Sequence, residues 1–250
     1  MTPVYERNKY LTDMPTTYCP GCMHGTATKL IAEVIEEMGI GGKTVICESV
    51  GCSYNLFKFM DLDFFGAAHG RAPAVATGFK RVKPDVPVVV YQGDGDCASI
   101  GMGETIHAAA RGENITVIMV NNQIYGMTGG QMAATTLVGQ KTTTSPKGRS
   151  AEESGYPIRV AEMIASLDAP KYVARFALHT PKHILQAKKA IRRAMEVQVY
   201  EKGYSYVELL SACPTNWKID PKNGPAYMEE KTIPVFPLGV FKDVKEEAAK

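Results

Sequence analysis

Two groups of polar residues in this chain have the chemistry of a site for magnesium and phosphate: Gly93-Asp94-Gly95-Asp96 and Asn121-Asn122. Glycines allow backbone N–H groups to approach a phosphate closely, and a helix that begins after them adds its positive N-terminus. The Asp94 carboxylate and the Asn122 amide oxygen are hard ligands that suit Mg²⁺. The pair predicts a diphosphate held through a magnesium ion. The alternative is a tight turn in an Asx-rich loop, which is common in α/β domains.

The elements around these residues are expected to bring them together. Val86–Gln92 and Ile115–Val120 are apolar runs of strand length, and the segment from about Ser99 to Arg111 is typical of a helix. Strand, glycine-rich turn, helix and strand form one βαβ unit, whose ligand site is expected at the carboxyl ends of its strands. Asp94 and Asn122 each follow a strand of this unit, so we expect their side chains to converge.

Cysteines form the second candidate site. Cys19 and Cys22 form a C-x-x-C motif, Cys52 follows a short strand, and Cys213 precedes a proline. Four cysteines of this kind fit an iron–sulfur cluster, a structural zinc site or buried thiols without a metal. Spacing alone leaves all three possibilities open. Cys47 lies within a strand and Cys97 in the first turn after the GDGD motif, and neither is included in the metal-binding set.

Composition excludes several classes of partner. The 250 residues include 28 basic and 26 acidic side chains, for a net charge of +2, so no nucleic acid or membrane partner is implied. The apolar runs are shorter than the roughly 20 residues of a membrane span. The start of the chain, MTPVYERNKYL, lacks the apolar region of a signal peptide, so we expect a cytoplasmic protein, in which free or metal-bound cysteines are more common than disulfides.

The alternation of strands and helices predicts an α/β fold with a doubly wound, mostly parallel sheet. We expect a single domain over residues 1–250, with an N-terminal arm (1–23) and an irregular C-terminal tail (about 217–250). Residues 54–65 are interpreted as an aromatic loop. Residues 124–156 lack periodicity and are interpreted as a functional loop over the diphosphate.

The order of motifs then resembles a known family. The spacing of GDGD and NN is similar to the thiamine diphosphate motif of thiamine-dependent enzymes. YCPGC, GCS, HGRA, GDGD, NNQIYGMTGGQ and CPTN together resemble the β subunits of 2-oxoacid:ferredoxin oxidoreductases, from Cys19 to Trp217. The stretches HGRAPAVATGFKR, MTGGQ and CPTNW look most like bacterial 2-oxoisovalerate (branched-chain) members.

The resemblance implies roles for individual residues. Cys19, Cys22, Cys52 and Cys213 match the ligands of a [4Fe–4S] cluster. Asp94, Asn122 and the backbone oxygen of Ile124 match the magnesium ligands. The positions that match contacts to thiamine diphosphate are Val50, Gly51, Cys52, Ser53, His69, Gly70, Arg71, Gly93, Gly95, Asp96, Tyr125, Gly126 and Met127.

The resemblance also implies a reaction and partners. It implies oxidative decarboxylation of a 2-oxoacid with coenzyme A, with electrons passing through the cluster to ferredoxin. The catalytic glutamate is expected on an α subunit that carries the pyrimidine-binding domain, and γ and ferredoxin-like δ subunits are expected beside it. The isolated chain should therefore bind the cofactor poorly and turn over no substrate. Glu104 is interpreted as a helix-surface or capping residue.

Substrate choice has one sequence indicator. Several members that use other substrates carry a lysine three residues after the third cluster cysteine, where this chain has Asn55. Loss of that cation favours an uncharged branched side chain over a dicarboxylate. Pyruvate or 2-oxoglutarate remains an alternative, as does a non-oxidative thiamine-dependent decarboxylase or carboligase. A cluster carrier without its own chemistry is a third hypothesis, which leaves the spacing of GDGD and NN unexplained.

The remaining histidines give weaker indications. His69 precedes Gly70-Arg71 at a helix start and is the histidine placed nearest the cofactor. His107, His179 and His183 are expected to be packed or solvated.

Overall fold

The computed structural model describes residues 6–244, so the outermost parts of the expected arm (1–5) and tail (245–250) lie outside the described residues. Within that range, one seven-stranded sheet has the order β2-β1-β3-β4-β6-β5-β7, and its neighbouring strands are parallel except β7 with β5. The strands are β1 (Val45–Ser49), β2 (Asp63–Ala67), β3 (Val88–Gly93), β4 (Thr116–Asn121), β5 (Tyr172–Ala177), β6 (Ser205–Leu210) and β7 (Gly239–Asp243).

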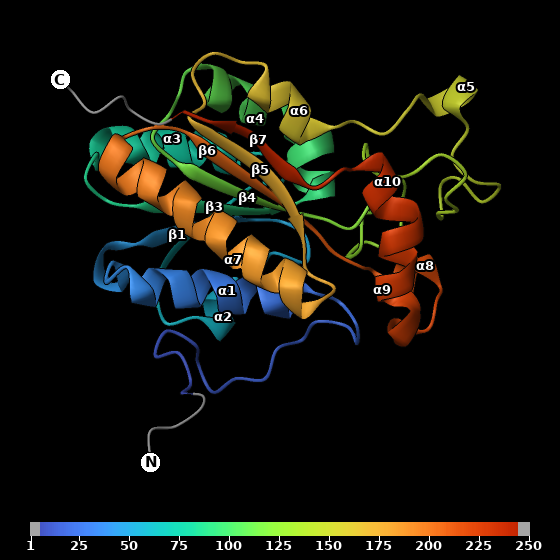
Figure 1. Ribbon diagram of the computed structural model, residues 1–250, viewed down its shortest axis with the longest axis horizontal. Coiled ribbons are helices and arrows are strands. Elements are labelled where there is room, and N and C mark those ends of the chain that lie inside the picture. Colours follow the sequence, from blue (N-terminus) through green and yellow to red (C-terminus); the bar gives the residue numbers. More distant parts are fainter. Residues whose placement is uncertain (1–5, 245–250) are drawn as a thin grey trace.

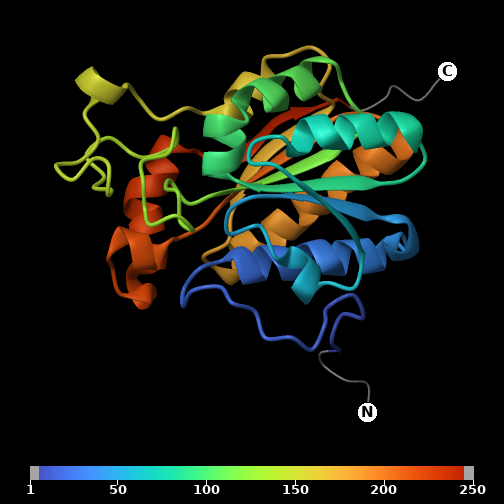
Figure 2. The same cartoon turned by 180° about the vertical axis from the view of Figure 1, so that it is seen from behind.

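Helices cover both faces of the sheet, as Figures 1 and 2 show from opposite sides. One face carries α1 (His24–Glu37) and α7 (Pro181–Glu196), and the other carries α3 (Ala72–Val82), α4 (Met102–Ala110) and α6 (Val160–Ala165). The expected doubly wound, mostly parallel α/β fold is confirmed. In the described part of the chain, no helix combines the length and the apolar character needed to cross a bilayer.

The other helical segments are short. They are η1 (Gly41–Lys43), α2 (Leu56–Phe59), η2 (Gly95–Ile100), α5 (Ala151–Ser154), η3 (Val197–Glu201), α8 (Pro214–Trp217), η4 (Pro221–Asn223), α9 (Gly224–Tyr227), η5 (Met228–Thr232) and α10 (Ile233–Val235).

Strand β3 shows how one sequence run is buried from two sides. Val89 and Tyr91 belong to the core cluster beneath α1 and α7. Val88 and Val90 belong to the cluster beneath α3, α4 and α6. All four side chains are fully buried. Parallel strands covered on both faces read as continuous apolar runs, which is why the sequence of β3 predicted a strand without alternating polarity.

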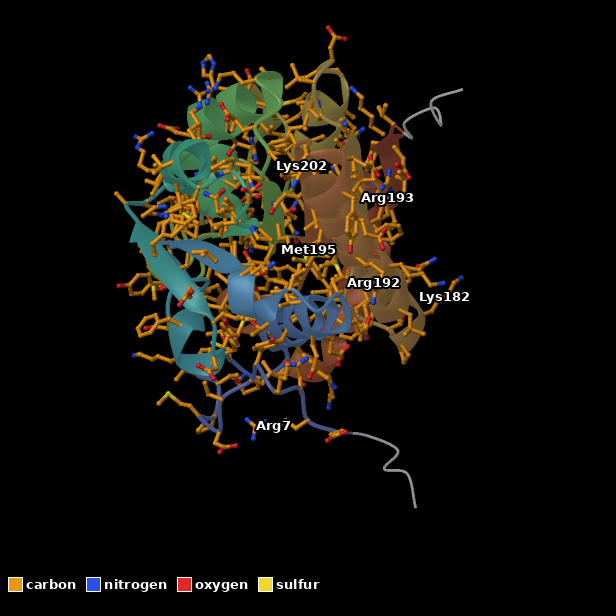
Figure 3. All side chains as sticks on the ribbon, turned by 90° about the vertical axis from the view of Figure 1, so that its left-hand side faces the viewer. Arg7, Lys182, Arg192, Arg193, Met195 and Lys202 are labelled. Atoms are coloured by element: carbon orange, nitrogen blue, oxygen red, sulfur yellow. The ribbon has the colours of Figure 1, made fainter. Side chains whose placement is uncertain are left out.

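Helix α7 packs one face on the sheet and leaves the other in solvent. Its N-terminus is capped by Thr180, whose hydroxyl accepts a hydrogen bond from the backbone N–H of His183, and Pro181 occupies the first turn. Figure 3 shows Arg192 on this helix, where its side chain is partly exposed, whereas Met195 is buried. The helix ends at Glu196 and continues as the wider turn η3 (Val197–Glu201).

The aromatic loop expected over residues 54–65 is wrong in part. The segment contains α2 and the edge strand β2, which pairs in parallel with β1. The sequence of β2 is DFFGA, in which two adjacent phenylalanines obscure any alternation. Phe65 stacks on Phe79 of α3 at 5.0 Å, so tertiary packing stabilises a strand whose own pattern is weak.

The irregular tail expected from about residue 217 is also wrong as far as residue 243. Short helical segments fill residues 221–235, and β7 adds an antiparallel strand to β5. Pro221, Pro225 and Pro234 lie in the first turns of these helices. Proline is compatible with that position because its missing N–H has no helical partner there, so these prolines start helical turns.

The helix after the GDGD motif begins earlier than expected. Segment η2 follows Asp94 directly, and the backbone N–H of Gly101 donates to the oxygen of Asp96 at 2.8 Å, five residues back. This wider turn precedes α4. Such π-type turns inside helices occur often at functional sites.

The expected loop over residues 124–156 is largely irregular apart from α5. A buried arginine organises it: the Arg149 guanidinium donates to the backbone oxygens of Ala134, Thr136, Ser154 and Tyr156, at 2.7–3.0 Å. The segment is therefore an ordered loop built around one cation.

Candidate functional site

A pocket opens at the carboxyl edge of the sheet between β1 and β3. There the chain leads outward in opposite directions, from β1 to β2 and from β3 to β4, which is the expected place for a ligand in such a sheet. The pocket is lined by His24, Val50, Gly51, Cys52, His69, Gly93, Asp94, Gly95, Asp96, Asn122, Ile124, Tyr125, Gly126, Met127 and Thr128. The two ends of the βαβ unit thus meet in one pocket.

Three residues expected at the cofactor, Ser53, Gly70 and Arg71, do not line this pocket. The Ser53 hydroxyl donates to a backbone oxygen of β1 at 3.1 Å, and the Gly70 N–H donates to Asp96 Oδ1 at 2.6 Å. Arg71 forms an ion pair with Glu104 on α4. In this structure Glu104 is thus a partner of Arg71 on the helix surface.

Asp94 is the first residue after β3, and its side chain is buried. Burial raises the pKa of its carboxyl to about 7, and a hydrogen bond from the Thr135 hydroxyl to Oδ2 opposes the rise. A carboxyl in this environment gains its charged form most readily beside a cation. Asp94 therefore has the properties of a metal ligand.

Two polar groups converge beside Asp94, the side-chain amide of Asn122 and the backbone oxygen of Ile124. The side-chain amide of Asn122 places one terminal atom 2.8 Å from the backbone oxygen of Ile124 and 3.2 Å from Asp94 Oδ1. If the Asn122 atom at this position is the NH₂ group, it donates to both the Ile124 and the Asp94 oxygens. If it is the amide oxygen, three oxygens face one another and a cation must lie among them. Neighbouring ligands of an octahedral magnesium ion lie about 3 Å apart, given Mg–O distances of about 2.1 Å. The spacing fits a magnesium ligand set with the amide oxygen turned inward.

Asp96, the second carboxylate of the motif, has a different role. Its Oδ1 accepts hydrogen bonds from the Ser49 hydroxyl at 2.9 Å and the Gly70 N–H at 2.6 Å, and it contacts His69 Nδ1. Its Oδ2 accepts from the Gln92 side-chain amide. Both carboxylate oxygens of Asp96 are therefore occupied by contacts within the protein. Through these contacts Asp96 holds the loop after β2 against the turn after β3.

Position 95 must be glycine because the Tyr125 ring packs against its backbone. A Cβ atom on Gly95 would lie 2.5 Å from the Tyr125 ring. That ring meets the His69 imidazole edge to face at 6.1 Å. The second glycine of the motif therefore permits the loop after β4 to close onto the turn after β3.

His24 is a pocket residue that the sequence did not indicate. It begins α1, is 1% exposed, stacks on Tyr18 at 5.2 Å and forms a 2.7 Å hydrogen bond with the Tyr91 hydroxyl. Burial lowers the pKa of His24 to about 4, so its imidazole is neutral at neutral pH. A single histidine at a helix start has no spacing that reveals this role. Thr128 likewise lines the pocket without a sequence indicator.

A second pocket adjoins the first and contains the four candidate cysteines. Its lining is Thr17, Tyr18, Cys19, Cys22, Cys52, Tyr54, Asn55, Asn122, Gly126, Met127, Cys213 and Asn216. It shares Cys52, Asn122, Gly126 and Met127 with the first pocket. A Cβ atom on Gly126 would lie 3.2 Å from Cys52 Sγ and 3.6 Å from Cys213 Sγ. The Gly126 backbone thus forms a thin wall between the two pockets.

The cysteines are held in turns that face this second pocket. The Cys22 N–H donates to the Cys19 oxygen at 3.0 Å, and the Asn216 amide donates to Cys213 Sγ at 3.4 Å. Burial, with a smaller contribution from neighbouring thiols, raises the pKa of Cys22 to about 11 and that of Cys52 to about 12. Thiols in this setting become thiolates when a metal supplies the positive charge.

The spacing of the sulfur atoms bears on which metal centre fits. Among the described residues, the group whose ligand atoms all lie within 4.8 Å of one another is His179, His183 and Glu229, and no three of the pocket's cysteines meet that limit. Ligands of a single tetrahedral zinc would lie about 3.8 Å apart, given Zn–S distances of about 2.3 Å. The described sulfur atoms therefore do not form a preassembled tetrahedral zinc site.

Cys47 and Cys97 line neither of these two pockets. Both are fully buried. Cys47 Sγ donates to the Ala72 oxygen at 3.5 Å, and Cys97 Sγ lies 3.4 Å from the Thr105 hydroxyl. They pack in the core beneath α3 and α4.

Comparison with known proteins identifies relatives of this chain. Residues 29–209 match the thiamine pyrophosphate enzyme family, C-terminal TPP binding domain. The chain is 46% identical to ketoisovalerate oxidoreductase subunit VorA of Methanothermobacter thermautotrophicus, over 98% of this chain and 51% of that one. It is 37% identical to 2-oxoglutarate synthase subunit KorB of Archaeoglobus fulgidus, over 94% and 87%.

A solved structure agrees with these sequence matches. The 2-oxoglutarate:ferredoxin oxidoreductase of Magnetococcus marinus superposes with a TM-score of 0.79 and 28% identity, over 98% of this chain and 87% of that chain. The chain therefore belongs to the thiamine pyrophosphate enzyme family. The resemblance to subunits of 2-oxoacid:ferredoxin oxidoreductases is confirmed. The chain spans about half the length of the ketoisovalerate oxidoreductase subunits that it matches.

Proposed function

We propose that this chain is the cofactor-binding β subunit of a 2-oxoacid:ferredoxin oxidoreductase. The observation that carries the proposal is the wall at Gly126, which places a diphosphate-type pocket directly beside a four-cysteine pocket. A non-oxidative thiamine enzyme needs only the first pocket, and a cluster carrier only the second. An enzyme that combines decarboxylation with electron transfer needs both, side by side.

In the first pocket, thiamine diphosphate would be held through Mg²⁺ by Asp94, Asn122 and the backbone oxygen of Ile124. The buried Asp94 carboxyl and the converging oxygens support this assignment. Gly93 leaves room for backbone contact with the diphosphate, since a Cβ there would meet no atom within 4 Å. His69, Tyr125 and the neutral His24 line the pocket and would orient the cofactor.

In the second pocket, Cys19, Cys22, Cys52 and Cys213 would hold a [4Fe–4S] cluster. When bound, thiamine diphosphate supplies the chemistry that releases CO₂, and the cluster accepts electrons one at a time. This chain's own residues would position both groups, and Tyr18, Tyr54 and Met127 line the cysteine pocket beside the four cysteines.

The overall reaction converts a 2-oxoacid and coenzyme A into acyl-CoA and CO₂. The C–C bond to the carboxylate breaks, the C–S bond of the thioester forms, and two electrons and one proton are released. Ferredoxin takes the electrons. We infer that an α subunit supplies the pyrimidine-binding domain and the catalytic glutamate, that γ and δ subunits complete a cytoplasmic assembly, and that this chain alone is inactive.

The proposed substrate is a branched-chain 2-oxoacid of the 2-oxoisovalerate type. The 46% identity to ketoisovalerate oxidoreductase subunits supports this choice. Asn55 lines the cysteine pocket and places an uncharged side chain there. Acyl-CoA formation from 2-oxoisovalerate, pyruvate and 2-oxoglutarate would be compared, and a preference for 2-oxoglutarate would contradict the assignment.

The metal centre is tested by anaerobic purification with the partner subunits, followed by iron and sulfide analysis of the separated chain. We expect roughly four irons per chain, largely lost in Cys213→Ala and retained in the control Cys97→Ala. Zinc in place of iron would favour a non-oxidative enzyme, and equal iron in both variants would exclude Cys213 as a cluster ligand.

The diphosphate site is tested by titrating the assembled enzyme with thiamine diphosphate and Mg²⁺. Asp94→Asn should weaken binding by at least about tenfold because it removes the charged ligand. The matched control is Asp85→Asn, which alters an exposed carboxylate just before β3. Equal affinity in the two variants would exclude Asp94 as a magnesium ligand.

A further inference from the structure

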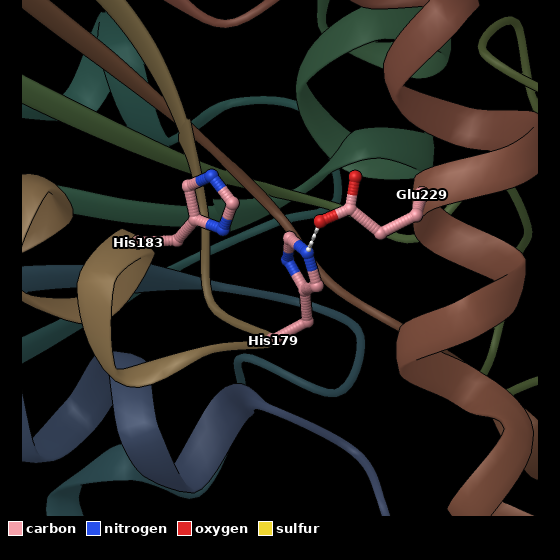
Figure 4. A group of neighbouring side chains, drawn as sticks. All are labelled: His179, His183 and Glu229. Atoms are coloured by element: carbon pink, nitrogen blue, oxygen red, sulfur yellow. Dashed lines mark hydrogen bonds and ion pairs between the residues drawn. The ribbon is translucent and has the colours of Figure 1, made fainter.

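A second cluster of metal-ligating side chains lies away from both pockets. It consists of His179, His183 and Glu229, whose ligand atoms all lie within 4.8 Å of one another. His179 follows β5, His183 lies in the first turn of α7, and Glu229 comes from η5 (Figure 4). Two segments far apart in sequence, the β5–α7 connection and η5, therefore meet at this point.

The contacts within the cluster orient its members. His179 Nε2 lies 2.6 Å from Glu229 Oε1, and the two imidazole rings stack at 4.6 Å with an interplanar angle of 24°. His183 Nδ1 lies 2.8 Å from the hydroxyl of Thr180, the residue that caps α7. That bond fixes the ring of His183 and leaves its Nε2 available as a ligand.

One buried nitrogen atom of the cluster has no hydrogen-bond partner among the described residues. It is Nδ1 of His179, whose side chain is fully buried. When Nε2–H donates to Glu229, Nδ1 carries a lone pair that needs a donor or a metal ion. A buried polar atom left in this state is costly, so the site favours an occupant.

The charge of the cluster suits a cation. Two imidazoles stacked at this distance resist becoming cationic together. Burial, and next the neighbouring His179, lower the pKa of His183, while Glu229 partly opposes that shift. The cluster offers nitrogen ligands from two imidazoles and oxygen ligands from one carboxylate. Glu229 has a half-exposed side chain, so it can move to complete a coordination shell.

We propose that His179, His183 and Glu229 form a binding site for a divalent transition-metal ion, with one nitrogen from each imidazole and one oxygen from the carboxylate. Imidazole with carboxylate suits Zn²⁺ and disfavours Mg²⁺, so this site would take a different ion from the pocket at Asp94. Water would fill a remaining coordination position.

The ion would act as a cross-link. It would tie the end of β5 and the start of α7 to η5. Two residues before Glu229, Tyr227 packs on Trp217 with ring centroids 4.6 Å apart. The indole of Trp217 in turn donates a hydrogen bond to the backbone oxygen of Asn122. The site is thus a clamp on the segment that supports the loop between the two pockets.

The first test counts zinc on the enzyme purified with its partner subunits. The enzyme is dialysed against a chelator and then against buffered Zn²⁺, and zinc, iron and sulfide are measured in each sample. The wild type and the control His107→Gln, which alters an exposed histidine on α4, should each retain roughly one more zinc ion per chain than the double variant His179→Gln, His183→Gln. Equal zinc in all three proteins overturns the proposal.

The iron and sulfide counts separate this result from zinc in the cysteine pocket, because zinc there would replace iron. Glu229→Gln provides a second test in case the double variant misfolds, because the Glu229 side chain is half exposed and its substitution should not disturb the fold. This variant should weaken zinc binding at least tenfold. Crystals grown with Zn²⁺ provide an independent measurement by anomalous scattering at the zinc edge. A peak between His179 and His183 supports the site, and zinc found at the cysteines alone overturns it.

Discussion

The indole Nε1 of Trp217 donates a 2.9 Å hydrogen bond to the backbone oxygen of Asn122. The residue before it, Asn216, donates to the backbone oxygen of Gly126 at 2.9 Å. Helix α8 thus holds both ends of the loop that passes between the two pockets. A segment of the chain that is remote in sequence sets the position of the candidate magnesium and cluster ligands.

Trp217→Phe tests that support. The substitution keeps an aromatic ring and removes one hydrogen bond, worth about 1 kcal/mol. We expect thiamine diphosphate affinity to fall about fivefold, measured by calorimetry on the assembled enzyme with Mg²⁺ in excess. The control is Tyr227→Phe, which keeps the ring that packs on Trp217 and should change the affinity less than about twofold. Unchanged affinity in Trp217→Phe would show that α8 does not position the loop.

Gly126→Ala tests the wall between the pockets. The added methyl would lie 3.2 Å from Cys52 Sγ and 3.6 Å from Cys213 Sγ, and it would intrude on any cluster held there. We expect a clear loss of iron and sulfide from the purified chain. Gly103→Ala is the matched control, because a Cβ at that helical position meets no atom within 4 Å. Equal iron content in the two variants would contradict close contact at Gly126.

Arg175→Met tests a buried ion network below the site. Arg175 is fully buried, its Nε lies 2.9 Å from Glu208 Oε2, and Glu208 accepts a 2.7 Å hydrogen bond from Asn121. Removing the cation leaves a buried carboxylate unpaired, at a cost of about 3–5 kcal/mol in the free energy of unfolding. Chemical denaturation of the isolated chain measures it.

The control for that experiment is Arg192→Met on α7, where the arginine side chain is 36% exposed and pairs with Glu37. An exposed pair contributes at most about 1 kcal/mol. A loss in Arg175→Met no larger than this would mean that the buried network contributes little.

Glu48→Gln tests a buried carboxyl at the end of β1. Glu48 is 3% exposed, accepts the Leu56 N–H at 3.0 Å, and burial raises its pKa above 4.5. Because the folded state then binds the proton more tightly than the unfolded state, stability from this group is present below about pH 4.5 and is lost as pH rises through the raised pKa. The wild type should therefore lose stability with rising pH relative to Glu48→Gln.

Unfolding free energies of the apo chain, measured from about pH 4 to about pH 8, would check the predicted loss of stability. This range covers the expected titration of a carboxyl with a raised pKa. Glutamine keeps an acceptor for Leu56, so the difference between the proteins should be smallest at the acidic end. Glu152→Gln, which alters an exposed carboxylate of α5, should follow the wild type at every pH. A pH-independent difference for Glu48→Gln would exclude titration of Glu48 as its cause.

The sequence predicted the elements whose pattern is local. The runs that form β3 and β4 are apolar because both faces are covered, and the polar residues after them converge because parallel strands end at one edge. The cysteines that line one pocket were likewise recognisable from their turns. These features depend on residues close in sequence, so periodicity and spacing reveal them.

What the sequence did not indicate depends on tertiary contacts. Strand β2 exists because Phe65 packs on α3, and β7 because the edge of β5 accepts it. His24 enters the pocket because Tyr18 and Tyr91 hold it there. No local pattern encodes contacts of this kind, and the stacked pair of His179 and His183 belongs with them.

The outermost strands of the sheet bear on how the protein avoids unwanted association. Both β2 and β7 are five residues long. Strand β7 presents Lys242 and Asp243, and its register against β5 shifts between Val173 and Ala174. Short, charged and irregular borders are poor templates for strand addition by a foreign chain. The two borders of the sheet are therefore guarded against polymerisation through their own backbone.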